Sequence, residues 1–147
     1  MREELPKEWK SIKRKNRYTD IYKDKLWSAL SLFVVARDTK LYGGRCIVCG
    51  QKKTLQAGHY APASNCGLDL CFDETNVHGE CEYDNGFNAG HLIGYKTGLI
   101  TRYGVPYAEK LEERYNDSRY KGKTTKITKM EYINRAVDLV KRTKEYV

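Results

Sequence analysis

The fold is decided by three short stretches: Cys46-Ile47-Val48-Cys49, Ala57-Gly58-His59-Tyr60 and Asn76-Val77-His78-Gly79-Glu80-Cys81-Glu82-Tyr83-Asp84-Asn85. The first stretch is a C-x-x-C knuckle. Cys81 opens a second knuckle, in which Asp84 stands where the last cysteine belongs. Two such turns from separate segments supply the four ligands of a tetrahedral zinc ion. The spacing therefore predicts a centre held by metal, with one imperfect knuckle.

Three cysteines and one aspartate are the predicted structural zinc ligands, namely Cys46, Cys49, Cys81 and Asp84. A carboxylate can ligate zinc, but the fourth ligand could also be His78, Cys71 or water. A third possibility is that zinc has been lost and that packing replaces it. Cys66 and Cys71 are interpreted as small apolar residues rather than ligands.

Size and composition limit the class of protein. The chain has 147 residues, 40% hydrophobic and 31% charged, which predicts one globular domain. Its five cysteines are an odd number, which does not favour a disulfide framework. No apolar run approaches the ~20 residues that span a bilayer, and the charged N-terminus lacks a signal core. We therefore expect a cytoplasmic protein without a membrane partner.

The net charge of +8 is unevenly distributed. No lysine or arginine occurs between Lys53 and Lys96, and this central stretch carries six acidic residues: Asp69, Asp73, Glu74, Glu80, Glu82 and Asp84. A basic protein with an acidic centre suits a polyanion that must meet a cation at one point. Solvated lysine-rich helix faces would give the same charge pattern, so charge alone does not identify DNA as the partner.

The chain predicts an α+β domain at residues 19–147, with a core at about 45–100, preceded by a flexible basic arm at 1–18. A first helix starts at Thr19 or Asp20 and ends before Gly43-Gly44. Short extended pieces follow at 54–56 and 76–80.

Helices are also predicted in the second half of the chain. One starts at Asp84, weakened by Gly86 and Gly90, and a short one runs from Pro106 to Tyr115. Residues 116–125 are expected to be a polar loop. The capping box at 128–131 opens the last helix.

The order of a cysteine pair, a Gly-His and an asparagine after the second knuckle resembles the HNH branch of the ββα-metal endonucleases. Residues 56–60, 76–78, Cys81, Asn85 and Gly90 are more specifically similar to the NinG (Rap) family of lambdoid phages. That family reads A-G-H-Y, then N-I-H-x-Q-C-x-x-C-N, then S-G-N, and residues 98–104 resemble its continuation. Two departures are Asp84 for the fourth cysteine and His91 for the last asparagine.

The resemblance implies a zinc-stapled ββα-metal core flanked by helices, and a phage recombination nuclease that acts on branched DNA such as Holliday junctions and D-loops. Its implied catalytic residues are His59, Asn76 and Asn85. Junction cutting usually needs two active sites, so a homodimer is expected. Phosphate contacts are expected from the basic residues Lys13, Arg14, Lys15, Arg17, Lys96 and Arg102.

Phosphodiester hydrolysis suggests a role for each residue. His59 takes a proton from water, because histidine exchanges protons near neutral pH. Many HNH enzymes have an acid just before this histidine, but here Gly58 stands there. Asn85 is therefore expected to be the main ligand of a catalytic Mg²⁺ or Mn²⁺, helped by His91. Asn76 is expected to brace the loop that aims the histidine.

Two alternative functions fit parts of the same pattern. A non-catalytic zinc module that binds DNA would keep the cysteines but would have no use for His59. An HNH enzyme for nicking, homing or DNA packaging would use the same residues on linear duplex.

Overall fold

A two-stranded antiparallel sheet lies at the centre of the protein, seen here in a computed structural model that describes residues 4–86, 88, 90–121 and 126–147, without the side chains of 118–121. Strand β1 (Leu55–His59) pairs with β2 (Val77–Cys81). The register places Gly58 opposite His78 and Gln56 opposite Glu80. The predicted α+β class is confirmed.

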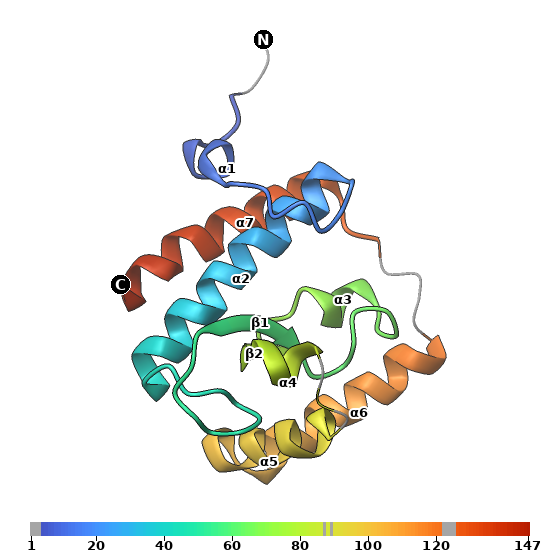
Figure 1. The fold of residues 1–147 in the computed structure, drawn as a ribbon. Helices are drawn as coiled ribbons and strands as arrows, with labels where there is room; N and C mark the ends of the chain where they lie inside the picture. Colours follow the sequence, from blue (N-terminus) through green and yellow to red (C-terminus); the bar gives the residue numbers. More distant parts are fainter. Residues whose placement is uncertain (1–3, 87, 89, 122–125) are drawn as a thin grey trace.

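The sheet lies between two groups of helices (Figure 1). On one side, α2 (Ile21–Tyr42) packs against α7 (Lys129–Thr143), which is followed by a single 3-10 turn, η1 (Lys144–Tyr146). On the other side, α5 (His91–Tyr103) packs against α6 (Val105–Lys121). Each face of the hairpin thus meets a different helical layer.

Two hydrophobic cores follow from this arrangement. The first joins α1, α2 and α7 through Trp9, Trp27, Leu30, Phe33, Ile133 and Leu139. The second lies beneath α5 and α6 and includes Ile47, Tyr60, Leu70, Tyr95, Leu99 and Leu111. Successive side chains of a strand point to opposite faces, so β1 contributes Ala57 to the first core and leads into Tyr60 in the second.

The helix boundaries with clear capping residues are confirmed. The Asp20 side chain accepts hydrogen bonds from the backbone N–H groups of Tyr22 and Lys23 at the start of α2. Gly43, in the left-handed conformation at φ 65°, ends this helix. The Thr128 hydroxyl accepts from the backbone N–H of Glu131 and starts α7.

Residues 4–18 differ from the flexible arm that we predicted, whereas residues 1–3 lie outside the described chain. They form α1 (Lys7–Ser11) and a segment that packs on α2. Trp9 is buried in the first core, and the buried Asp24 carboxylate accepts the backbone N–H groups of Asn16, Arg17 and Tyr18. The segment is ordered because α2 offers it a buried carboxylate.

The region after β2 also differs from the prediction. The expected helix from Asp84 is divided into α4 (Glu82–Gly86) and α5, with Gly90 at the N-cap of α5. A four-residue helix, α3 (Leu68–Cys71), interrupts the loop between the strands. Helix α6 begins at Val105 and runs beyond Tyr115 to Lys121, so residues 116–121 are helical rather than a loop, and 122–125 lie outside the described residues.

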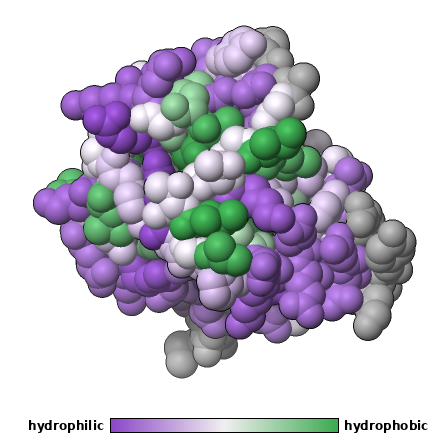
Figure 2. Space-filling view, turned by 90° about the horizontal axis from the view of Figure 1, so that it is seen from below, coloured by the Kyte–Doolittle hydropathy of each residue, from purple (hydrophilic) through white to green (hydrophobic). Residues whose placement is uncertain are grey.

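The surface of the molecule on the side of α5 and α6 is mostly hydrophilic, with hydrophobic side chains in separate small groups (Figure 2). None of the helices in the described ranges is both long and apolar enough to cross a lipid bilayer.

Asp24→Asn should loosen residues 14–18, because it removes a buried charge that accepts hydrogen bonds from the Arg14 side chain and three backbone N–H groups. We expect a loss of about 2 kcal/mol and faster trypsin cleavage in this segment. Asp20→Asn is the matched control, because asparagine caps a helix as well as aspartate. Equal effects of the two substitutions would contradict this account.

The same contact predicts acid sensitivity. Burial raises the pKa of Asp24, but the hydrogen bonds from Arg14 and the 16–18 backbone outweigh it and lower the pKa below its ordinary value. Its stabilisation is therefore complete above the unfolded pKa of about 3.9 and is lost as the pH falls through the lower folded pKa. Denaturation measured against pH should show a smaller acid loss for Asp24→Asn.

Candidate functional site

The four predicted zinc ligands meet at one place, which we call the cysteine cluster (Cys46, Cys49, Cys81 and Asp84). Their ligand atoms all lie within 4.8 Å of one another. Oδ2 of Asp84 is 3.2 Å from Sγ of Cys46 and 3.1 Å from Sγ of Cys81. Ligands at about 2.0–2.3 Å from a tetrahedral zinc lie ~3.5 Å apart, so the cluster could bind a metal such as zinc.

Asp84 is suited to be the fourth ligand because it is held as a carboxylate. Burial opposes its ionisation, but hydrogen bonds from the surrounding thiols and from Asn88 prevail and lower its pKa to about 2. Burial raises the pKa of the thiols of Cys46, Cys49 and Cys81. Thiols that can exchange their protons for a metal, together with an ionised carboxylate, are donors that zinc accepts.

His78 and Cys71, the alternative fourth ligands, lie elsewhere. His78 is fully buried, with Nδ1 3.0 Å from the Tyr95 hydroxyl and Nε2 3.3 Å from the Tyr107 hydroxyl. Burial lowers its pKa well below the ordinary value, so its imidazole is neutral. His78 is therefore a hydrogen-bonded core residue.

The first knuckle is fixed against α5 by two glycines. A Cβ at Gly98 would overlap the carbonyl oxygen of Ile47, and a Cβ at Gly94 would lie 2.7 Å from the Val48 side chain. This close approach joins the cysteine cluster to the helix that begins with His91.

His59 is the last residue of β1 and lies on the face towards α2. Its ring stacks on Trp27, with centroids 4.8 Å apart and planes at 13°. Nε2 is 2.8 Å from the carbonyl oxygen of Cys71. A carbonyl only accepts hydrogen bonds, so Nε2 donates this one and Nδ1 is the ring nitrogen left for other contacts.

Asn76 holds the loop that supplies this carbonyl. It is fully buried, and its side chain accepts from the backbone N–H of Ala61 and donates to the carbonyl oxygens of Ala61 and Leu70. Leu70 immediately precedes Cys71. Asn76 has the position of a brace for His59 and contacts the backbone on both sides of the 61–71 loop.

Glu80, Asn85 and His91 meet on the other face of β1, above Gly58. A Cβ at Gly58 would overlap Oε2 of Glu80 and lie 2.7 Å from Oδ1 of Asn85. Asn85 is exposed, and its Nδ2 donates to Oε1 of Gln56 at 3.1 Å. His91 Nε2 is 2.5 Å from Oε1 of Glu80. Asn85 and His91 therefore both lie near the carboxylate of Glu80, and their predicted role as metal ligands stays a prediction.

The free edge of β1 borders a hollow of about 450 Å³, which we call the edge groove. Its walls include Trp27 of α2, Gln56 of β1 and Asn85 of α4, and its rim carries Lys15 and Arg17. Trp27, on which the His59 ring stacks, forms one wall, and Asn85 forms another. The groove is thus lined directly by Asn85, and His59 lies behind Trp27.

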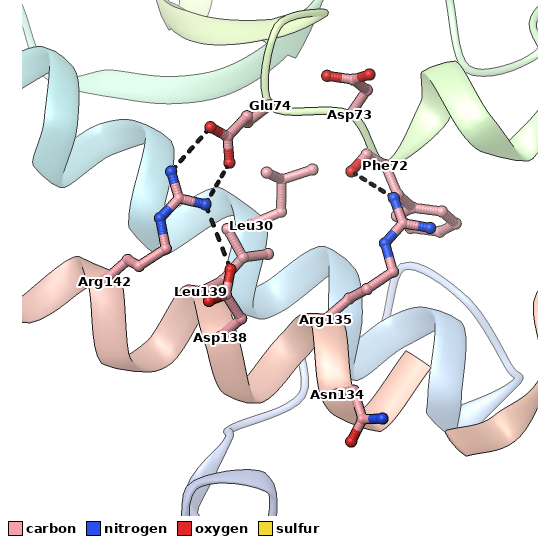
Figure 3. A pocket seen from close by; sticks show the side chains of 9 residues that line it. All are labelled: Leu30, Phe72, Asp73, Glu74, Asn134, Arg135, Asp138, Leu139 and Arg142. Atoms are coloured by element: carbon pink, nitrogen blue, oxygen red, sulfur yellow. Dashed lines mark hydrogen bonds and ion pairs between the residues drawn. The ribbon is translucent and has the colours of Figure 1, made fainter. Parts of the chain in front are cut away.

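A second hollow, of about 420 Å³, lies between α7 and the segment after α3 (Figure 3). Arg142 lines it but is bound by both oxygens of Glu74, and Arg135 donates to the carbonyl of Phe72. These contacts attach α7 to the 72–74 segment. The hollow contains none of the predicted site residues.

Comparison with known proteins identifies the family. A family model described as "Bacteriophage Lambda NinG protein" matches residues 2–143. The chain belongs to the NinG family.

Curated relatives agree with this assignment. Protein ninG of Salmonella phage P22 is 33% identical over 113 residues, which cover 76% of this chain and 54% of the relative. Protein ninG of Escherichia phage lambda is 33% identical, with 76% and 53% coverage. The chain spans about half the length of the curated relatives it matches. No solved structure shows a significant match.

The predicted DNA contacts of this NinG-family chain lie in two places, the N-terminal segment and α5. Lys13, Lys15 and Arg17 are exposed, and the Arg17 guanidinium lies 4.5 Å from the ring centroid of Trp27. Arg14 is tied down by an ion pair to Asp24. The N-terminal residues therefore offer charge beside the edge groove.

Lys96 and Arg102 lie on α5, away from this rim. Lys96 is 2.7 Å from a carboxylate oxygen of Glu112. Arg102 is only 10% exposed, donates to the carbonyl of Arg45 and stacks over Tyr42. The structure gives Arg102 a structural role instead of the predicted phosphate contact.

Several site residues of this NinG-family chain were not predicted. Cys71 positions His59 through its carbonyl, and its thiol is buried beside Cys66, which lowers the pKa of Cys71. Gln56 orients Asn85. Glu80 had one sequence signal: it is the acidic residue of the extended piece predicted at 76–80. Trp27 had no such signal, because in the sequence it is one more apolar residue of α2.

Zinc binding predicts one zinc per chain by elemental analysis. Chelation should lower the melting temperature by about 10 °C or more, because structural zinc contributes several kcal/mol and each shifts the midpoint by about 2–4 °C. Asp84→Asn should weaken zinc binding and Asp84→Cys should strengthen it, with Glu82→Gln as the exposed control. Purified protein that contains no zinc, and whose melting temperature the chelator does not change, would contradict this prediction.

Proposed function

We propose that this chain is a metal-dependent DNA endonuclease of the HNH type, which hydrolyses phosphodiesters in branched DNA such as Holliday junctions and D-loops. The observation that carries the proposal is the fixed imidazole of His59, which stacks on Trp27 in the wall of a basic groove that also contains Asn85. Family membership supports it, because the NinG-like motif includes these residues.

The edge groove provides the DNA contact. A nucleic-acid backbone is bound mainly through its phosphates, and Lys15 and Arg17 line the groove. Lys13 adds a nearby exposed charge. A phosphate held there lies between the His59 face and the Asn85 face of β1.

His59 acts as the general base. Its Nε2–H is held by the Cys71 carbonyl and its ring by Trp27, so Nδ1 is left to accept a proton from water. Asn76 fixes the loop that carries the carbonyl. Hydrolysis adds this water to the phosphorus and releases the deoxyribose oxygen, which takes up a proton.

Asn85 and His91 belong to the metal side of the site. Gln56 binds Nδ2 of Asn85, which turns Oδ1 towards the space above Gly58. Amide oxygens and imidazole nitrogens are common metal ligands in proteins. When bound, Mg²⁺ or Mn²⁺ stabilises the charge on the phosphate and on the leaving oxygen.

The cysteine cluster would hold a structural Zn²⁺. It lies at the junction of the first knuckle, the end of β2 and α4, so metal there fixes the helix that carries Asn85. Paired cuts in a junction need two active sites, so the proposal includes a homodimer.

Cleavage of a four-way junction with Mg²⁺ or Mn²⁺ tests this function. His59→Gln keeps an amide donor for the Cys71 carbonyl but cannot act as the base. We expect cleavage to fall by about 10²–10⁴-fold, with DNA binding and zinc content unchanged. Linear duplex and flap substrates should be cut more slowly than the junction.

Three outcomes would contradict the proposal in different ways. Equal cleavage by wild type and His59→Gln would exclude His59 as the base. DNA binding without cleavage by either protein would indicate a non-catalytic zinc module. Preferential cutting of linear duplex would indicate a nicking, homing or packaging enzyme.

A further inference from the structure

We propose that Glu80 is a ligand of a divalent-cation site that it forms with Asn85 and His91 in the space above Gly58, separate from the cysteine cluster. Cation binding at this site is inferred from geometry alone. A catalytic role of that cation rests on the nuclease function proposed above.

Glu80 is a buried carboxylate whose ion-pair partner among the described residues is His91. Its side chain is fully buried, and neither oxygen has a hydrogen-bond partner among the described residues. Buried charges in proteins are normally paired, hydrogen-bonded or bound to a metal. The side chain points into the space above Gly58, where Oδ1 of Asn85 also lies.

The contact between Glu80 and His91 is a close ion pair. Nε2 of His91 lies 2.5 Å from Oε1 of Glu80. Within the described part of the chain, the same nitrogen makes no well-formed hydrogen bond. Two ligands bound to one cation at about 2.0–2.2 Å lie ~3 Å apart, so a small separation of these groups would admit an ion.

Gly58 makes this arrangement possible. Its Cα leaves free the volume that a side chain at position 58 would fill, and Glu80 enters that volume from the neighbouring strand. A carboxylate therefore reaches this place from β2, although β1 has none to offer. His59 is the next residue along β1, and its ring lies on the opposite face of the strand from the proposed cation.

The donor set indicates the class of cation. One carboxylate oxygen, one amide oxygen and one imidazole nitrogen are mixed hard and borderline ligands. Imidazole favours transition metals over Mg²⁺ or Ca²⁺, so we expect Mn²⁺ to bind more tightly than Mg²⁺. Thiolates prefer zinc, which keeps the two sites chemically distinct.

Mn²⁺ binding to the zinc-loaded full chain tests the inference without reference to activity. Electron paramagnetic resonance of free Mn²⁺ and calorimetry should give one bound Mn²⁺ per chain. Glu80→Gln should weaken Mn²⁺ binding at least about tenfold. Loss of a group that only supports a metal ligand typically has an effect of this size, and loss of a ligand should have a larger one. Glu82→Gln, an exposed residue two positions away, should leave it unchanged.

His91→Asn provides a second variant, which carries the test alone if Glu80→Gln does not fold. Replacing nitrogen by oxygen should reduce the preference for Mn²⁺ over Mg²⁺. Unchanged Mn²⁺ affinity in the folded variants would overturn the inference and leave Glu80–His91 as an ion pair only.

The two proposals fail separately. Mn²⁺ binding that depends on Glu80, without any DNA cleavage, would support the cation site and refute the nuclease. Cleavage that depends on His59, with Mn²⁺ binding indifferent to Glu80 and His91, would support the nuclease and refute this site.

Discussion

The arrangement depends on the hydrogen bonds that Arg37 and Asp38 make with β2. A two-stranded sheet leaves unpaired backbone groups on both outer edges, and β2 is completely buried. Asp38 accepts the backbone N–H of Gly79 at 2.7 Å, and Arg37 donates to the carbonyl oxygens of Val77 and Glu74. The backbone N–H of Ile47 donates to the carbonyl of Gly79. Helix α2 and the first knuckle thus fix β2, and only the edge of β1 remains open.

The hairpin then separates two chemistries. At the end of β2, three cysteines and Asp84 form a group suited to zinc. Above Gly58 the donors are oxygen and imidazole, and on the opposite face His59 is held between Trp27 and the Cys71 carbonyl. Asp84 belongs to the first group, because Cys46 and Cys81 lie within 3.2 Å of its Oδ2. The carboxylate in the space above Gly58 is therefore that of Glu80 and not that of Asp84.

Local signals allowed correct predictions where the physical cause is local. The caps at Asp20, Gly43 and Thr128 act within one turn, and the cysteine cluster follows from the spacing of its knuckles. Errors arose where the partner is distant in sequence. Arg102 looked like a surface charge because Tyr42 and Arg45, which bury it, belong to another part of the chain. Glu80 was missed because the space it fills belongs to a different strand.

We propose a metal-dependent active site beside Gly58, separate from the cysteine cluster. Anomalous diffraction from a crystal of the zinc-loaded protein soaked in Mn²⁺ would locate both metals. We expect zinc at the cysteine cluster and a manganese peak bounded by Glu80, Asn85 and His91. Manganese found only at the cysteine cluster or on exposed carboxylates, with Glu80 bonded to His91 alone, would contradict this proposal.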